Sequence, residues 1–209
     1  MNLSSEPGPG PRPSTSRLRQ RPVTTVIASA FTIAVVALGY ALLGLLPALL
    51  FAFGFVAGLA LWIALPGQLP FAAIRWPYFI TLGLFALHKI EERQLDFFPA
   101  LSKLTGSPMP DTSSPLVYAL YAMAGAWLLI PVLLRRRILF GAFLAWTFFA
   151  AMGLVELAHF VFPFLTPKPV TYFPGLATAT MLVPAGWWGL WRTTAAARSA
   201  QIRPNHQTI

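Results

Sequence analysis

Long apolar runs, separated by short polar breaks, make up most of the chain. From Val23 to Leu65 no residue carries a charge over 43 positions, and about 20 apolar residues are enough for one α-helix to cross a membrane. We therefore expect two spans in this run, with the turn between them at Gly44 and Pro47. Four more runs follow, so that six spans are predicted at residues 23–43, 46–65, 71–90, 115–134, 138–162 and 170–191.

Composition agrees with an all-α, polytopic transmembrane bundle. Charged residues make up 10% of the chain and hydrophobic residues 56%, whereas a water-soluble domain carries about 25% charged residues. The net charge of +9 does not indicate nucleic acid, because the cations do not form a stripe interleaved with aromatic residues. The expected partners are membrane lipid and an apolar small-molecule substrate. The absence of cysteine excludes disulfides and thiolate metal ligands.

The positions of the cations predict the orientation of the bundle. Six spans place eleven cations on one side, including the run at 135–137, and the positive-inside rule makes this side cytoplasmic. Both termini then lie in the cytoplasm, with a disordered basic tail at residues 1–22 and a second tail at 193–209. The expected location is the inner (plasma) membrane, crossed several times. The cations left outside are Lys89, Arg93, Lys103 and Lys168.

One long connection, from Glu91 to Ser114, joins the third and fourth predicted spans. Apolar residues are scattered among polar ones in its first part, at residues 91–106. This pattern fits a short helix lying on the outer face of the membrane. It fits equally an ordinary loop that dips aromatic side chains into lipid. The pattern leaves both alternatives open.

Ionisable residues at membrane depth are the candidate functional groups, because each costs roughly 2.5–3.5 kcal/mol on insertion scales. The third span ends with His88, Glu91 and Glu92, and positions i+3 and i+4 of a helix lie beside position i on one face. Lys89 and Arg93 are expected to point elsewhere, toward the headgroups. The bland alternative is a span boundary whose charges already lie in the headgroup layer.

A second pair, Glu156 and His159, lies in the fifth span with a spacing that also places both on one face. Glu156 lies 17 residues after the start of its span at Leu139, and His88 lies 17 residues after Phe71. At 1.5 Å per residue both are about 25 Å into the membrane, near its outer side. The two parallel-running spans should therefore bring these groups to one level. A hydrogen-bonded pair that only fixes helix packing is the alternative.

Imidazole and carboxylate groups suit iron, manganese or zinc, and Glu-x-x-His on a helix is the spacing found in carboxylate-bridged metal sites of helical bundles. We therefore expect a divalent metal ion. The predicted ligands, enough for one ion or two, are His88, Glu91, Glu92, Glu156 and His159. Glu92 is predicted as ligand or general base. The same groups without metal could transfer protons on a lipid-like substrate.

The motif HKIEE at residues 88–92, with His159 and the later YFPG at 172–175, resembles the HxxEE-domain family of bacterial integral membrane proteins. The likeness covers about residues 71–190 and leaves out the apolar hairpin at 23–65 and the basic tail. It implies a membrane protein with a site at these residues and no particular reaction. Tyr172 is similar to the tyrosine of a family element that opens the last span, and we predict that it donates a hydrogen bond into the site as a catalytic residue.

The functional hypothesis is a membrane-embedded metal-dependent enzyme that acts on a lipid or other apolar substrate near the outer leaflet. One alternative is a metal-free acid–base isomerase or hydrolase that uses the same residues. The other is a transporter or a small-molecule binding protein, although no inverted repeat is apparent and the polar groups lie away from the midplane.

Overall fold

The computed structural model describes residues 15–66, 69–107, 109, 111, 113–166 and 172–202. Within these residues the chain is all-α, and no strand occurs. Five helical segments of this described part are long and apolar enough to cross a membrane, which confirms the predicted class of transmembrane helical bundle. They are Arg21–Leu43, Leu45–Ala64, Phe71–Gln94, Pro115–Arg135 and Leu139–Leu165.

The first two spans form the hairpin that the apolar run predicts. Helix α1 (Thr15–Leu43) and helix α2 (Leu45–Ala64) are joined by Gly44 alone. Gly44 has a φ of +83°, and a Cβ there would lie 2.2 Å from Ser107 Oγ, so both backbone and space require glycine. Helix α1 begins at Thr15, so residues 15–22 of the predicted tail are helical in the structure. The rest of that tail lies outside the described residues.

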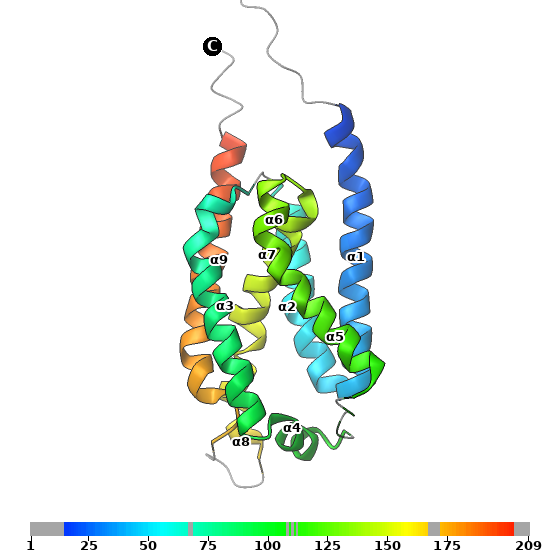
Figure 1. The fold of residues 1–209 in the computed structure, drawn as a ribbon, viewed down its shortest axis with the longest axis vertical. Helices are drawn as coiled ribbons and strands as arrows, with labels where there is room; N and C mark the ends of the chain where they lie inside the picture. Colours follow the sequence, from blue (N-terminus) through cyan, green and yellow to red (C-terminus); the bar gives the residue numbers. More distant parts are fainter. Residues whose placement is uncertain are drawn as a thin grey trace, which may run out of the picture.

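Helix α3 (Phe71–Gln94) is followed by a short helix, α4 (Phe97–Thr105). The long connection between the third and fourth spans therefore contains a helix and is not an ordinary loop. The chain turns before and after α4 at two left-handed residues, Asp96 and Gly106. Helix α4 lies across one end of the bundle (Figure 1), and its Leu101 is buried against Ala158 and Phe162 of the fifth span and Phe173 beyond it. Its contact with the membrane surface stays a prediction.

The fourth and fifth spans are each interrupted. The fourth consists of α5 (Pro115–Gly125), a 3₁₀ turn (Ala126–Leu129) and α6 (Ile130–Arg135). The fifth consists of α7 (Leu139–Ala150), a π-helical turn (Ala151–Val155) and α8 (Ala158–Leu165). Every residue from 141 to 150 is buried, so α7 forms the core of the bundle.

The last helix, α9 (Leu176–Ile202), packs along α3 and along the fifth span (Figure 1). It begins later and ends later than the predicted span at 170–191, and it makes residues 193–202 helical where a tail is predicted. Residues 203–209 lie outside the described part. Because tryptophan, threonine and Arg192 lower its hydropathy, α9 is not among the five apolar segments. The sixth span therefore stays a prediction.

The two ends of the bundle differ in charge. The start of α1, the turn between α6 and α7 with the arginines at 135–137, and the end of α9 all lie at one end (Figure 1). Helices α4 and α8 lie at the opposite end. This arrangement has the charge asymmetry that the positive-inside rule requires, and the assignment of the arginine-rich end to the cytoplasm stays a prediction.

Candidate metal centre

Four ionisable side chains from α3 and the fifth span meet at the α4 end of the bundle. His88 Nε2 lies 3.2 Å from Glu92 Oε1 and 3.1 Å from Glu156 Oε2. His159 Nε2 lies 3.5 Å and 3.2 Å from the same two oxygens. His88 is fully buried and both glutamates are only 7% exposed. The expectation that the two spans bring these groups to one level is confirmed, and the burial excludes a solvated span boundary.

Local helix geometry aims these side chains inward. On α3, His88 and Glu92 are one turn apart on one face. The π-helical turn ends directly before Glu156, and such a turn inserts an extra residue, which rotates the following side chains around the helix axis. The carbonyl oxygen of Gly153 in this turn accepts a hydrogen bond of 2.7 Å from Trp187 Nε1 on α9. Helix α9 therefore supports the turn that presents Glu156 and His159.

A hydrogen-bonded chain holds the far side of the His88 ring. His88 Nδ1 lies 2.8 Å from Thr178 Oγ1, which lies 2.5 Å from Glu91 Oε2. Because a carboxylate only accepts, the threonine hydroxyl donates a hydrogen bond to Glu91, and its oxygen accepts one from Nδ1–H of His88. With Nδ1 as the donor to Thr178, Nε2 faces the two carboxylate oxygens of Glu92 and Glu156, where either a proton or a bound cation would stabilise the contact.

Glu91 is predicted as a fifth ligand, and the structure does not bring it into the group. Its carboxylate accepts backbone N–H bonds from Gly175, Ala177 and Thr178, at 2.9–3.2 Å, and a hydrogen bond from the Tyr172 hydroxyl. The first N–H groups of a helix have no partner within it and attract a carboxylate. Of the five predicted ligands, the structure therefore brings four into a group that could hold a metal ion. Tyr172, predicted as catalytic, is 53% exposed and contacts Glu91 rather than the buried group.

Lys89 contacts the site, whereas the sequence predicts that it points toward the headgroups. Its Nζ lies 2.5 Å from Glu92 Oε2. The long side chain can follow its own helix to a position three residues ahead. This contact occupies one oxygen of Glu92 and leaves Oε1 facing the two imidazoles.

Aromatic rings and one glycine enclose the histidines. The ring of His159 packs against Phe97, Phe162 and Phe173, with centroids 5.6–6.1 Å apart. Gly175, with a φ of +92°, lies so close that a Cβ would be 2.5 Å from His159 Cε1 and 2.7 Å from His88 Cε1. The sequence offers a signal for Gly175 in its Pro-Gly pair, but none that singles out Phe97 or Thr178.

Comparison with known families now bears on these residues. A family model described as a protein of unknown function with HXXEE motif matches residues 79–189, more than half of the chain. The chain belongs to the HXXEE family. The matched residues contain the four buried groups together with the Glu91 and Thr178 that orient them. No curated protein and no solved structure matches the chain.

The donor set of this HXXEE protein fits a metal ion. Within the described residues, His88 Nε2 is buried without a hydrogen-bond partner, although two carboxylate oxygens lie within ion-pair distance. Lone pairs of one imidazole and two carboxylates that face one another repel unless a cation or a proton lies between them. Ligands about 2.1 Å from a tetrahedrally coordinated ion are about 3.4 Å from each other, which matches the four imidazole–carboxylate distances of 3.1–3.5 Å; all four donor atoms lie within 4.8 Å of one another.

Proposed function

We propose that this HXXEE protein is a membrane-embedded, metal-dependent enzyme that acts on a lipid or other apolar substrate near the outer leaflet of the bacterial inner membrane. The observation that carries the proposal is the Nε2 atom of His88. It is buried without a hydrogen-bond partner, Thr178 holds the other nitrogen of its ring, and two carboxylate oxygens lie 3.1–3.2 Å away. Such an arrangement is costly unless a proton or a cation lies between the imidazole and the carboxylates, and we propose that a bound divalent ion does so.

One divalent ion suits the group, with His88, Glu92, Glu156 and His159 as its ligands. Two imidazoles and two carboxylates without thiolate suit iron, manganese or zinc. Such an ion supplies a Lewis acid and lowers the pKa of a bound water. The chain's own residues orient the ligands: Thr178 and Glu91 hold His88, and Lys89 holds the outer oxygen of Glu92. Glu92 is thus better placed as a ligand than as a general base.

An apolar substrate is supported by the surroundings of the group. The ligands lie in segments that are apolar enough to cross a membrane, and three phenylalanine rings pack around His159. Water-soluble substrates would have to reach a group whose members are at most 7% exposed. A lipid or another apolar molecule can approach from the membrane side without leaving an apolar environment.

Metal analysis of the detergent-purified protein tests the proposal. We expect one ion per chain after expression with iron, manganese and zinc in the medium, and loss of that ion in His88→Ala and in His159→Ala. His206→Ala makes the same change at the third histidine of the chain, outside the residues that match the family, and should keep the ion. Gel filtration and thermal melting in detergent show whether each variant is folded.

Two outcomes would overturn the proposal. Protein without stoichiometric metal under every growth condition would show that the group is not a metal centre. A metal-bound protein whose activity on lipid extracts survives chelation of the ion, but not Glu156→Gln, would favour the acid–base alternative instead.

A further inference from the structure

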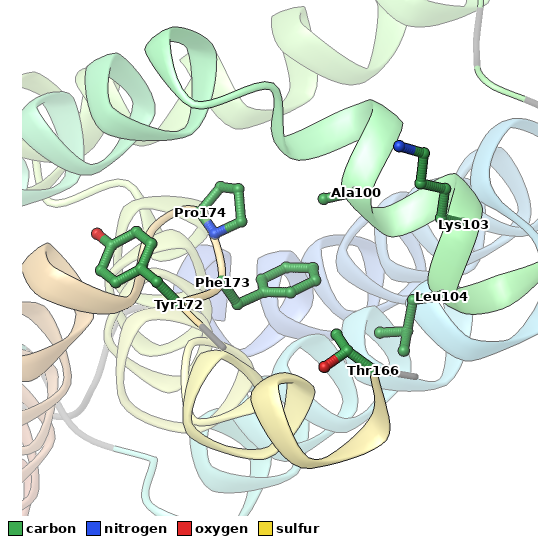
Figure 2. Close-up of a pocket in the computed structure, with 7 residues that line it drawn as sticks. All are labelled: Ala100, Lys103, Leu104, Thr166, Tyr172, Phe173 and Pro174. Atoms are coloured by element: carbon green, nitrogen blue, oxygen red, sulfur yellow. The ribbon is translucent and has the colours of Figure 1, made fainter. Parts of the chain in front are cut away.

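A pocket opens beside the candidate metal centre and is not part of it. Its volume is about 230 Å³. Three of its lining residues come from α4, one follows α8, and three precede α9, as Figure 2 shows. They are Ala100, Lys103, Leu104, Thr166, Tyr172, Phe173 and Pro174.

One aromatic ring connects this pocket to the centre. Phe173 lines the pocket and is only 2% exposed. The centroid of its ring lies 6.1 Å from that of His159, 4.7 Å from that of Phe162 and 5.9 Å from that of Phe97. A molecule in the pocket would therefore contact a side chain that itself packs on a proposed metal ligand.

The lining is apolar in the middle and polar at the edges. In Figure 2 the ring of Phe173 lies between Pro174 and Leu104, while Lys103 and Tyr172 lie at opposite edges of the lining. Lys103 is the cation of this lining. Pockets that enclose a whole drug-sized ligand measure about 300–1,000 Å³. This smaller one therefore suits one end of a longer molecule.

We infer that this pocket binds the head end of an anionic, single-chain amphiphile, with the anionic group at Lys103 and the first carbons of the chain against Leu104, Phe173 and Pro174. The inference rests on the proposed function, because it names the substrate class of the same enzyme. A carboxylate and a phosphate monoester share the required chemistry, and the choice between them is left to experiment.

Protection of a single cysteine from alkylation tests this binding. Because the chain has no cysteine, Ala100→Cys introduces one thiol inside the pocket, and Ser113→Cys introduces an exposed control thiol. Each variant is placed in phosphatidylcholine nanodiscs and treated with a maleimide in the presence of decanoate, decyl phosphate or decyltrimethylammonium. Whichever anion protects at the lower concentration identifies the headgroup.

We expect both anions to slow alkylation of Ala100→Cys at least tenfold at saturation and to leave Ser113→Cys unchanged. Added to Ala100→Cys, Lys103→Gln should raise the half-protecting concentration about fivefold, the size of a charge pair at an exposed rim. Lys103→Arg should keep protection. Arg93→Gln, which removes a charge outside the pocket lining, should also keep it.

Absence of protection by either anion would overturn the inference, as would equal protection by the cationic amphiphile, which would indicate partition into the bilayer only. The metal content of the same samples separates the two proposals. Bound metal without protection refutes the pocket inference alone, whereas protection in a protein that never holds metal refutes the metal enzyme and leaves the anionic amphiphile site in place.

Discussion

Gly175 offers the sharpest test of the site geometry, because two independent constraints act on it. Its φ of +92° lies in the region that L-residues with a side chain rarely adopt. A Cβ would also meet Cε1 of both histidine rings, at 2.5 Å and 2.7 Å. Gly175→Ala should therefore strain the backbone and displace both proposed ligands at once.

The loss of unfolding free energy in Gly175→Ala has two parts, backbone strain and steric overlap with the histidine rings. A left-handed backbone costs an alanine roughly 1–2 kcal/mol, and overpacking of a well-packed site costs typically 1–3 kcal/mol more. The histidine rings cannot move away cheaply, because Thr178 holds one of them and three phenylalanines surround the other. We expect Gly175→Ala to lower the free energy of unfolding by about 2–5 kcal/mol and metal affinity about 10- to 100-fold.

Two other glycines provide matched controls. Gly106 has a φ of +68°, and within the described part of the chain nothing lies within 4 Å of a Cβ built there, so Gly106→Ala carries the backbone strain alone. Gly83 lies in α3 with a helical backbone, and no atom of the described residues lies within 4 Å of a Cβ built there. Gly83→Ala should therefore leave the free energy of unfolding unchanged or raise it slightly. Thermal melting in detergent and metal titration would be measured for all three variants.

We expect Gly83→Ala to have the highest melting temperature of the three variants, Gly106→Ala an intermediate one and Gly175→Ala the lowest. For a chain of this size, 1 kcal/mol shifts the melting temperature by about 2–4 °C. Only Gly175→Ala should lose metal affinity. If Gly175→Ala melts together with Gly106→Ala and binds metal like the unchanged protein, Gly175 does not touch the two imidazoles, and the geometry argued for the centre is wrong.

Three further substitutions address the residues that orient the site. Thr178→Val keeps the shape but removes the hydroxyl that holds His88 Nδ1, so metal affinity should fall about 10- to 100-fold in a metal titration, and Thr178→Ser should restore it. Glu91→Gln should lower the melting temperature through weaker capping of α9 and weaken metal binding less than Glu92→Gln does, because Glu91 reaches His88 only through Thr178; equal loss of metal in both variants would contradict the separate roles of the two glutamates. Trp187→Phe removes the hydrogen bond to Gly153 and should cost about 1 kcal/mol of unfolding free energy in a denaturation curve, and an unchanged curve would refute its support of the π-helical turn.

Much of the fold follows from hydropathy, because a membrane imposes one physical requirement on every span. An apolar run of about 20 residues must be helical to satisfy its own backbone hydrogen bonds, so the hairpin at Gly44 and the third, fourth and fifth spans were predictable. Helix ends that extend beyond the apolar run follow other rules. Residues 15–22 and 193–202 are helical although their polar composition suggested tails, since arginine, glutamine and alanine favour helices as strongly as many apolar residues do.

The sequence predicts which ionisable residues lie near one another, but not which of the two adjacent glutamates faces the buried group. Residue spacing and depth identified His88, Glu156 and His159, because an ionisable residue inside an apolar run is costly whatever surrounds it. Spacing could not decide between Glu91 and Glu92, because positions three and four residues ahead flank His88 on either side, at about 60° and 40° around the helix axis. The choice depends on which neighbour lies on each side, and that is a property of tertiary packing.

That packing gives the two adjacent glutamates of the HXXEE motif distinct physical roles. On one side of His88, Glu92 faces the fifth span and the buried group. On the other side, Glu91 binds the exposed N–H groups at the start of α9 and, through Thr178, sets the proton of the same histidine. The same contacts therefore hold the start of α9 against α3 and orient the ring of His88. A protein in which α9 is displaced from Glu91 should lose the hydrogen bond from Thr178 that holds His88 and, with it, the orientation of Nε2 toward Glu92 and Glu156.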